Sequence, residues 1–343
     1  MTVAAAAKQA IKLSWLDLRG SRLSVIERLC LEEALLRHDK QNRSWAIMGS
    51  HDPLVHRYIN PRLPLYVQAS EDPNLTCIVV MGIGGKPQSL LNLDLIQQDG
   101  VVVTKRFSGG GTVVLDSSSI WTTFIGRTEH FPHVEPYPKS IMQWSADDVF
   151  TPAFRKLKQH YTPSSSSAGD QRTLIPDSKS CSPTDNLGTV LTIPSKEPPS
   201  PSPSQMPLFS LVENDYVLDD RKMGGNAQSI VKGGWLHHTS FLWDYQDEHM
   251  GYLTIPNKRP DYRGDRHHSE FLVKLNQFYG NKPGVFYESV QDACRENNFQ
   301  VEEVTLREAM EVVNDLGGMQ EWFENSSRTR ILDDFFGEKP PAE

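Results

Sequence analysis

Three consecutive glycines between two apolar segments are the feature of this sequence that most constrains its fold. Gly109, Gly110 and Gly111 follow a strand-like segment at residues 101–103 and precede another at residues 112–115. Consecutive glycines cost backbone entropy, so they are kept where the main chain turns sharply or approaches a ligand with no Cβ in the way. The run therefore predicts strands that flank a turn with a close backbone approach.

Two cations, Lys105 and Arg106, stand at the mouth of this turn. Fixed positive charge beside exposed N–H groups suits a carboxylate or a phosphate. An ordinary hairpin would also explain a Gly-Gly pair, and the Gly-Lys-Ser/Thr ending of a P-loop is missing. A second glycine-rich turn at residues 82–87 follows the apolar segment at residues 77–81. Two such turns after apolar strands predict one site lined by the ends of neighbouring strands.

Composition excludes some classes of function. The 343-residue chain has a net charge of −8, so nothing global favours binding to nucleic acid or to an anionic membrane, and an anionic ligand needs local cations. The longest apolar runs have the length of strands, which predicts no membrane span. The first residues resemble no secretory signal, and we expect an intracellular protein, cytoplasmic or mitochondrial.

The four cysteines are Cys30, Cys77, Cys181 and Cys294, and they are far apart in the sequence. Their spacing predicts neither a metal site nor a disulfide framework, in keeping with a reducing compartment. Cys30 and Cys294 lie on apolar faces of predicted helices and are interpreted as packing residues.

The chain divides into three parts by composition. A helix with a Ser24–Glu27 capping box is expected at residues 23–37, and another, with an interruption near Trp144, at residues 137–158. Residues 161–206 are rich in serine and proline and are expected to form a disordered insertion. Three domains are predicted from this division. Residues 1–158 with 208–280 form the first, residues 161–206 are the insertion, and residues 281–343 are an acidic helical extension.

A second conspicuous segment spans residues 214–230. An apolar strand ends in an Asp-Asp-Arg turn, and Lys222 opens the returning strand just before Gly224 and Gly225. Such a lysine can reach over the sheet surface, where burial and carboxylates tune its charge, although an ordinary hairpin lysine is an alternative. His237 and His238 follow in the next strand, where they must point to opposite faces. At most one of them faces the site, and neither is expected to bind a metal.

Taken together, Arg-x-Ser-Gly-Gly-Gly, then Asp-x-Lys-x-x-Gly-x-Ala, then His-His resemble the lipoate–protein ligase A family. The resemblance implies an α+β fold of the biotin/lipoate protein ligase type, with a mixed, mostly antiparallel sheet packed with helices. It covers about residues 11–158 and 208–280 of the predicted catalytic domain, and no winged-helix segment is expected before this domain.

The family activity implied by this resemblance has two steps. Lipoate or octanoate attacks the α-phosphate of ATP, which enters with Mg²⁺, and the acyl-adenylate then gives its acyl group to an acceptor lysine. The implied partners are lipoyl-domain proteins, such as the E2 subunits of 2-oxoacid dehydrogenases and the H protein of glycine cleavage. Nucleic acid and membranes are not implied as partners.

The resemblance also implies roles for particular residues. Lys222 would be the catalytic residue, holding the acyl carbonyl and the α-phosphate oxygen, while no residue is expected to ligate a metal. Residues that would bind the substrate and the adenylate are Arg106, Ser108, Gly109, Gly110, Gly111, Gly225, Ala227 and His238.

Three departures from the family pattern leave alternatives open. Lys105 replaces an arginine, Leu115 replaces a histidine, and the C-terminal part is shorter than the accessory domain of bacterial ligases. One alternative is an octanoyl or lipoyl transferase that takes an activated acyl group, with Cys77 as the only thiol worth testing. The other is a binding module that holds a lipoylated partner without catalysis; keeping Lys222 with its glycines speaks against it.

Overall fold

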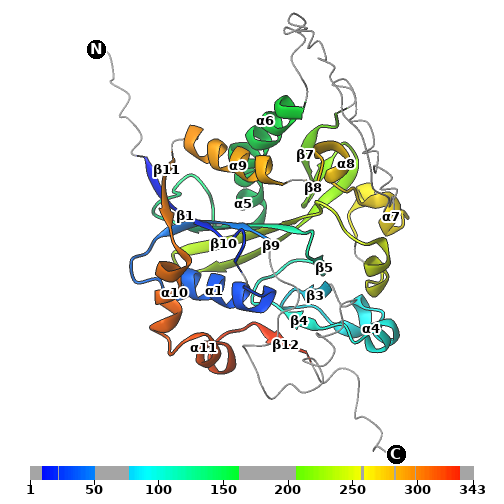
Figure 1. Cartoon of the computed structure of the whole chain (residues 1–343), viewed down its shortest axis with the longest axis horizontal. Helices are drawn as coiled ribbons and strands as arrows, with labels where there is room; N and C mark the ends of the chain where they lie inside the picture. Colours follow the sequence, from blue (N-terminus) through cyan, green and yellow to red (C-terminus); the bar gives the residue numbers. More distant parts are fainter. Residues whose placement is uncertain are drawn as a thin grey trace, which may run out of the picture.

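Strands from both ends of the chain build one large sheet (Figure 1). The computed structural model describes residues 10–21, 23–50, 77–161, 206–255, 259–281, 283–297 and 299–332. Within these residues the large sheet has eight strands in the order β11-β1-β2-β6-β10-β9-β8-β7. Its strands, in chain order, are β1 (Ile11–Asp17), β2 (Ser44–Gly49), β6 (Ile120–Arg127), β7 (Phe209–Val212), β8 (Asp215–Leu218), β9 (Arg221–Val231), β10 (Gly234–Phe241) and β11 (Phe299–Val304).

The sheet is mixed in direction. β11, β1 and β2 run parallel to one another, whereas every pairing from β2 to β7 is antiparallel. This agrees with the expected α+β fold and its mostly antiparallel sheet.

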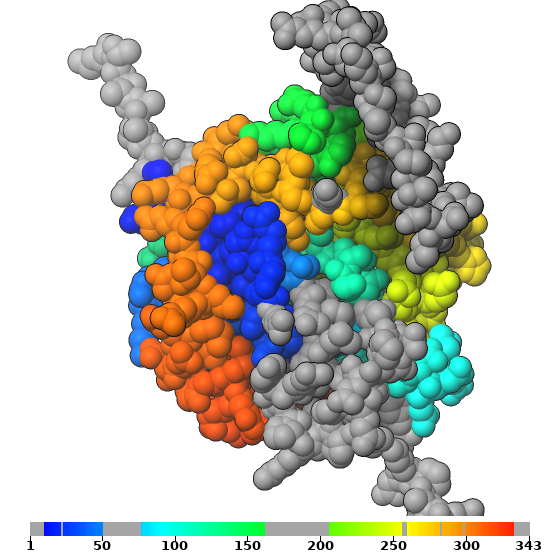
Figure 2. Space-filling model, viewed as in Figure 1, coloured from blue at the N-terminus to red at the C-terminus, as the bar shows by residue number. Residues whose placement is uncertain are grey.

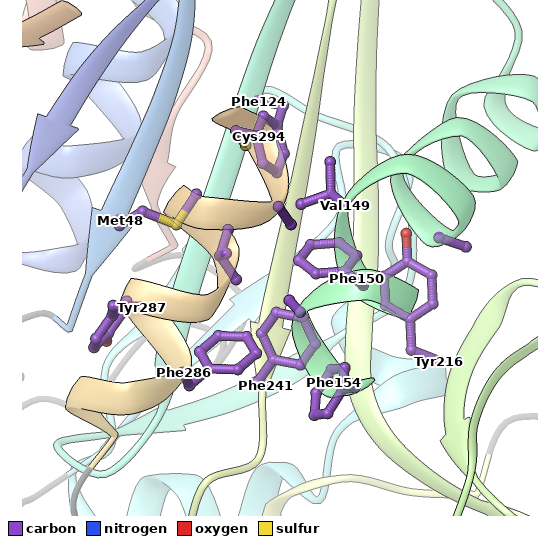
Figure 3. Close-up of a cluster of buried hydrophobic side chains, with 14 of the residues drawn as sticks. Met48, Phe124, Val149, Phe150, Phe154, Tyr216, Phe241, Phe286, Tyr287 and Cys294 are labelled. Carbon is purple, nitrogen blue, oxygen red and sulfur yellow. The ribbon is translucent and has the colours of Figure 1, made fainter. Parts of the chain in front are cut away.

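Helices cover both faces of this sheet. One face packs against α5 (Pro138–Trp144), a π-helical segment η1 (Ser145–Phe150), α6 (Thr151–Tyr161) and α9 (Gly284–Glu296). Aromatic side chains fill this interface: Phe286 of α9 lies 5.4 Å from Phe154 and 5.0 Å from Phe241, between ring centroids (Figure 3). The expected interruption near Trp144 is confirmed, because the π-helical segment begins at the next residue.

The opposite face packs against α1 (Val25–His38), α10 (Leu306–Asn314) and α11 (Met319–Asn325). The Ser24–Glu27 capping box predicted from the sequence is present. Eleven residues of α1 are buried, because sheet, α10 and α11 enclose it. Arg28, Glu32 and Glu33 are among them, so this helix carries charge into the interior.

A small sheet carries the glycine-rich turns. Its order is β12-β4-β3-β5, formed by β3 (Cys77–Met81), β4 (Val103–Lys105), β5 (Val113–Asp116) and β12 (Arg330–Ile331). Two short helices, α3 (Pro87–Leu90) and α4 (Leu93–Asp99), replace the single helix expected at residues 90–98. The strand predicted at residues 101–103 begins only at Val103.

The segment after residue 281 corrects a prediction. It was expected to be helical, but β11 pairs with β1 in the large sheet and β12 pairs with β4 in the small one. In the space-filling view the orange-to-red surface of this segment lies beside the blue N-terminal surface (Figure 2). Glu302, Glu303 and the other polar residues of β11 hid its strand character, because an edge strand carries polar side chains. The domain boundaries themselves stay a prediction.

The remaining described elements are short and follow β10. They are η3 (Asp247–Tyr252), η4 (Asp261–Arg263), α7 (His268–Phe271) and α8 (Asn276–Tyr279). The predicted disordered insertion at residues 161–206 lies, except for its two end residues, outside the described residues. Among the described residues, no helix is both long and apolar enough to cross a membrane.

Candidate functional site

The three-glycine loop packs against an open edge of β9. β8 pairs with β9 only as far as Gly224, which leaves the following residues of β9 without a strand on that side. The N–H of Gly109 donates to the carbonyl of Gln228 over 2.8 Å, so the loop takes this edge. A Cβ on Gly110 would lie 2.7 Å from the carbonyl oxygen of Asn226. The φ of Gly110 is +109°. Both the close carbonyl and this positive φ therefore exclude a side chain at position 110.

The two glycine-rich turns touch each other, as expected from the sequence. The N–H of Ile83 donates to the carbonyl of Ser108 over 2.9 Å. A Cβ on Gly82 would lie 2.2 Å from the carbonyl oxygen of Gly110, so this position also requires glycine. Because β3 and β4 are parallel neighbours, their carboxyl ends bring the two turns together.

Arg106 shapes the loop from within. Its guanidinium donates to Ser108 Oγ (3.0 Å) and to the carbonyls of Val80 (3.2 Å), Gly109 (3.1 Å) and Gly111 (2.7 Å). Burial lowers the pKa of Arg106 to about 10, which still leaves it charged at neutral pH. These four bonds use four of its five N–H groups, so one N–H is left for a ligand.

A small cavity lies where the two conspicuous segments of the sequence meet. Its volume is about 30 Å³, enough for no more than a few water molecules. Val80 of β3, Val113 and Leu115 of β5 and Trp121 of β6 form its apolar walls. Its other lining residues are Arg106, Gly225, Asn226, Ala227, His238 and Ser240. Four of the sequence-derived site residues thus share one cavity.

His238 faces this cavity from β10, and its ring is held on both nitrogens. Nδ1 lies 2.8 Å from Glu32 Oε2, and Nε2 lies 2.7 Å from Ser108 Oγ. Burial lowers the pKa of His238, against the raising effect of Glu32. Burial alone would raise the pKa of Glu32, but Arg28 and the hydrogen bond from His238 lower it below its ordinary value. The pair is therefore a neutral imidazole beside a carboxylate.

His237 points to the other face of the sheet, as strand alternation requires. Its ring contacts the Tyr216 hydroxyl (3.1 Å) and the Gln228 amide (2.9 Å). Burial lowers the pKa of His237 to about 3, so it is neutral and structural.

A β-bulge aims Lys222 at the site face of the sheet. Val217 pairs with Lys222, but the preceding Tyr216 pairs with Gly224, so Met223 is an extra residue in β9. Met223 lies in the core on the α6 side, and the residue before it therefore points the opposite way. Without the bulge, Lys222 would share the face of Gly224 and point into that core. Bulges re-aim side chains in this manner beside active sites.

The Lys222 amine forms a salt bridge with Asp215, and the Tyr262 hydroxyl holds that carboxylate in place. Nζ lies 2.7 Å from Asp215 Oδ1, and the Tyr262 hydroxyl donates to Asp215 Oδ2 over 3.0 Å. The Lys222 side chain is 25% exposed. The amine is therefore partly accessible but held in place, and its salt bridge is open to replacement by a ligand.

The segment from Arg259 to His268 places more positive charge near Lys222. Burial lowers the pKa of His268 to about 4, helped by Arg263, His267 and Lys222, which makes these groups electrostatic neighbours. Arg263 is only 6% exposed, and among the described residues its Nη2 has no hydrogen-bond partner. The sequence analysis missed Asp215, Arg263 and His268 as site neighbours. The density of cations at residues 259–268 was the available signal.

Cys77 does not have the environment of a nucleophile. Burial, followed by the charges of Asp116 and Asp99, raises the pKa of its thiol to about 12. The thiolate is the reactive form of cysteine, so this position disfavours the thiol-based transferase. Among the described residues, no group of three or more His, Cys, Asp or Glu side chains could hold a metal ion.

The predicted site residues other than Gly111, whose carbonyl accepts from Arg106, therefore fall into four groups. Arg106, Gly225, Ala227 and His238 line the cavity, and Gly109 and Gly110 lie against β9 beside it. Ser108 is buried behind the loop. Lys222 lies farther along β9, on the same sheet face but outside the lining of this cavity. Their roles in binding and catalysis stay a prediction.

The sequence of this chain is similar to a known family and to a curated protein. The family described as lipoyl protein ligase A/B catalytic domain matches residues 74–297. The sequence is also similar to "Inactive lipoate--protein ligase 2" from Plasmodium falciparum, with 26% identity over 273 residues. That alignment covers 74% of this chain and 62% of the relative, so the chain spans less than two thirds of its length.

Solved structures share the fold at low sequence identity. A lipoate-protein ligase A bound with ATP superposes with a TM-score of 0.53 and 14% identity, covering 90% of this chain and 94% of the other. A bipartite lipoate protein ligase described with its E2 lipoyl domain, from Thermoplasma acidophilum, gives a TM-score of 0.57 and 14% identity, covering 91% and 97%. At this identity the likeness concerns the fold alone.

Proposed function

This chain belongs to the lipoyl protein ligase A/B catalytic domain family, and we propose that it is a lipoate–protein ligase. The proposed reaction joins lipoate or octanoate to AMP at the expense of ATP and passes the acyl group to a lysine of a lipoyl-domain protein. In the first step a carboxylate oxygen bonds to the α-phosphorus and pyrophosphate leaves. In the second, the lysine amine bonds to the acyl carbon and AMP leaves.

The observation that carries this proposal is the placement of Lys222 by the β-bulge. It puts a held amine on the sheet face that also carries Gly225, Ala227 and His238. An acyl-adenylate lying along β9 on this face would contact the Lys222 amine. We propose that Lys222 exchanges Asp215 for the acyl carbonyl and the α-phosphate oxygen. A preorganised donor for developing oxygen charge contributes about 3–4 kcal/mol to a transition state.

The loop and the cavity support the same proposal. Glycines at positions 109 to 111 let the main chain approach the adenylate, and the remaining N–H of Arg106 would assist. The apolar cavity wall of Val80, Val113 and Trp121 suits a hydrocarbon chain. Its small volume means that an acyl chain has to separate these walls on entry. Leu115 belongs to the same wall, so its replacement of the family histidine fits an apolar role.

The cations at residues 259–268 support the use of ATP. Arg263 and Lys222 are both electrostatic neighbours of Asp215 and His268, and among the described residues the buried Nη2 of Arg263 has no hydrogen-bond partner, so it would neutralise phosphate oxygens there. Mg²⁺ would enter as part of the MgATP substrate. The proposed acceptors are lipoyl domains such as that of an E2 subunit, which the Thermoplasma ligase is described with. An H protein of glycine cleavage is a second proposed acceptor.

A second candidate function is acyl transfer without ATP activation. The name of the Plasmodium relative describes it as inactive. This favours a second hypothesis, in which the chain does not form the adenylate but transfers the acyl group of a preformed lipoyl-adenylate. Cys77 would have no part in such a transfer, given its buried and raised-pKa thiol.

The intact mass of a purified lipoyl domain after incubation with the full chain separates these functions. One reaction contains lipoate and MgATP, a second contains synthetic lipoyl-adenylate, and a third contains no acyl donor. The ligase proposal expects the mass of one lipoyl group to be added in the first two reactions. Addition in the second reaction alone would replace the ligase by a transferase, and no addition would leave only a binding module.

A further inference from the structure

A line of buried hydrogen bonds joins helix α1 to the glycine loop, and it begins at Arg28 and Glu32, two side chains that the proposed chemistry does not use. It runs from Arg28 and Glu32 of α1, through His238 of β10, to Ser108 at the start of the loop. Arg28, Glu32 and Ser108 are completely buried, and His238 is 3% exposed. Glu32 and Ser108 are 76 positions apart in the sequence, so the line is a tertiary feature.

With a neutral His238 ring, the donors and acceptors of this line allow one arrangement. Glu32 Oε1 accepts from Arg28 Nε (2.9 Å) and Thr123 Oγ1 (2.7 Å), so the other oxygen, Oε2, is left for His238. A carboxylate only accepts, so His238 must carry its proton on Nδ1. Nε2 is then a lone pair that accepts from the Ser108 hydroxyl. The same Ser108 oxygen accepts from Arg106 Nε (3.0 Å).

The ring of His238 is also fixed by its aromatic neighbours. Phe107 and Trp121 both meet it edge-on, with centroids at 5.7 and 5.5 Å. The guanidinium of Arg28 lies over Trp121, 4.7 Å from the ring centroid, and also donates to its carbonyl. Neither the ring orientation nor the tautomer of His238 can change without disturbing α1.

From this geometry we infer that Glu32, held by Arg28, is a positioning residue of the substrate site. It fixes the tautomer of His238, which anchors Ser108 and thereby holds Gly109, Gly110 and Gly111 against β9. The identity of the ligand that the loop receives rests on the proposed function. The positioning itself rests only on the contacts above.

A role in stability alone is a weaker explanation for the buried ion pair of Arg28 and Glu32. Buried ion pairs recover little more than their desolvation cost, and apolar residues of the same volume serve stability at least as well. Helix α1 already has a wide apolar interface with the sheet, α10 and α11. What an apolar residue at position 32 could not do is select one tautomer of His238.

Glu32→Gln tests the inference, because it keeps the shape and changes one acceptor into a donor. The Gln carbonyl must still accept from Arg28 and Thr123, so its amide N–H faces His238 Nδ1. His238 should therefore switch its proton to Nε2. Long-range ¹H–¹⁵N spectra of histidine-labelled full-length protein report this change directly. An unchanged tautomer in Glu32→Gln would overturn the inference.

The consequence for the loop is measured separately. Amide hydrogen exchange of the peptide covering residues 105–111 should be at least 10-fold faster in Glu32→Gln than in the wild type. The affinity for lipoyl-sulfamoyl adenosine, a stable analogue of the acyl-adenylate, should fall by a similar factor. Tyr216→Phe is the matched control, since it removes buried hydrogen bonds to Ser145 and His237 on the other sheet face. Equal effects in both variants, or no effect in either, would overturn the inference.

Failure of the proposed function gives a different result. If the wild-type chain does not bind the analogue, the ligase proposal fails, while the tautomer and the hydrogen exchange of the loop still decide whether Glu32 positions it. If the wild type binds and Glu32→Gln binds equally well, the ligase proposal stands and the positioning role is lost.

Discussion

A single extra residue, Met223, decides where Lys222 points. If β9 alternated regularly through Met223, from Gly224 back to Lys222, the lysine would point toward the aromatic core. The amine is instead held by Asp215, whose second oxygen is bound by Tyr262. An amine held in this way loses little conformational entropy when it exchanges a carboxylate for substrate oxygens. The site is therefore preorganised for binding these oxygens.

Lys222→Ala should lower the single-turnover rate of acyl-adenylate formation by roughly 10²–10³-fold, the usual loss for one oxyanion donor. The free energy of unfolding should change by no more than about 1 kcal/mol, because the lysine is partly exposed and Asp215 keeps the Tyr262 hydroxyl. Lys232→Ala, at the exposed turn after β9, is the control and should leave the rate unchanged. A wild-type rate in Lys222→Ala removes this residue from the mechanism.

His237 should make the fold sensitive to acid. Its pKa falls from 6.5 to about 3 on folding because the ring is buried. Between these values the unfolded chain binds a proton that the folded chain does not, so stability decreases as the pH falls. The slope from this group should average about 1 kcal/mol per pH unit between pH 7 and 5. Urea unfolding of the wild type and His237→Gln between pH 7 and 5 measures it. Equal slopes in the two proteins would show that His237 does not contribute.

The sequence could reveal some of these residues and not others. The glycines, Lys222 and His238 stand out because their types are costly or unusual in apolar strands. The bulge that aims Lys222 leaves no mark, since Met223 is an ordinary apolar residue in a strand. Arg106 was expected to face a ligand, but four of its N–H groups bind the protein itself, two of them at the loop carbonyls of Gly109 and Gly111, and only the folded geometry reveals that.

At the scale of elements, the glycine loop is a segment held from three directions. The edge of β9 binds Gly109, the second glycine turn binds Ser108 through Ile83, and the line from α1 binds the Ser108 side chain. β12 also pairs with β4, the strand that leads into the loop. The prediction of a helical C-terminal segment missed this support, because a two-residue strand has no periodicity to detect.

Gly110→Ala should weaken binding of lipoyl-sulfamoyl adenosine by about 10-fold or more. The new Cβ would stand 2.7 Å from the Asn226 carbonyl and 3.1 Å from the Ala227 Cα, at a φ that L-residues rarely adopt, so the loop must leave β9. Gly233→Ala is the control, since it has a similar positive φ but open space around it. Its strain of about 1–2 kcal/mol should lower stability without changing affinity. Equal affinity losses in both variants would contradict the close-approach explanation.

At the scale of the whole molecule, elements from the N-terminal and C-terminal parts of the described chain pack together. β11 adds to β1 at the edge of the large sheet, α10 and α11 cover α1, and β12 then reaches the small sheet (Figures 1 and 2). The mixed sheet was expected from the family resemblance, since the central strands β2, β6 and β10 are buried along their whole length and show no alternation. Its parallel edge joins β1 to a strand nearly 290 residues later, a pairing that no local pattern could indicate.

Residues 163–205 should be dispensable for this architecture. The chain leaves α6 and returns beside it, because Lys158 Nζ donates to the Met206 carbonyl over 3.2 Å. A short Gly/Ser linker can therefore replace the segment, and loop length costs little free energy. We expect the shortened chain to keep its thermal transition and its activity toward a lipoyl domain. A collapse of either would give the segment a structural or functional role.

The most direct measurement is exchange of labelled pyrophosphate into ATP by the wild-type chain, with lipoate, octanoate or biotin supplied in turn. A ligase that forms an acyl-adenylate on the Lys222 face of β9 should exchange label with lipoate or octanoate, but not with biotin or without an acid. Absence of exchange with every acid, from a folded chain that still transfers the acyl group of synthetic lipoyl-adenylate, would contradict the account.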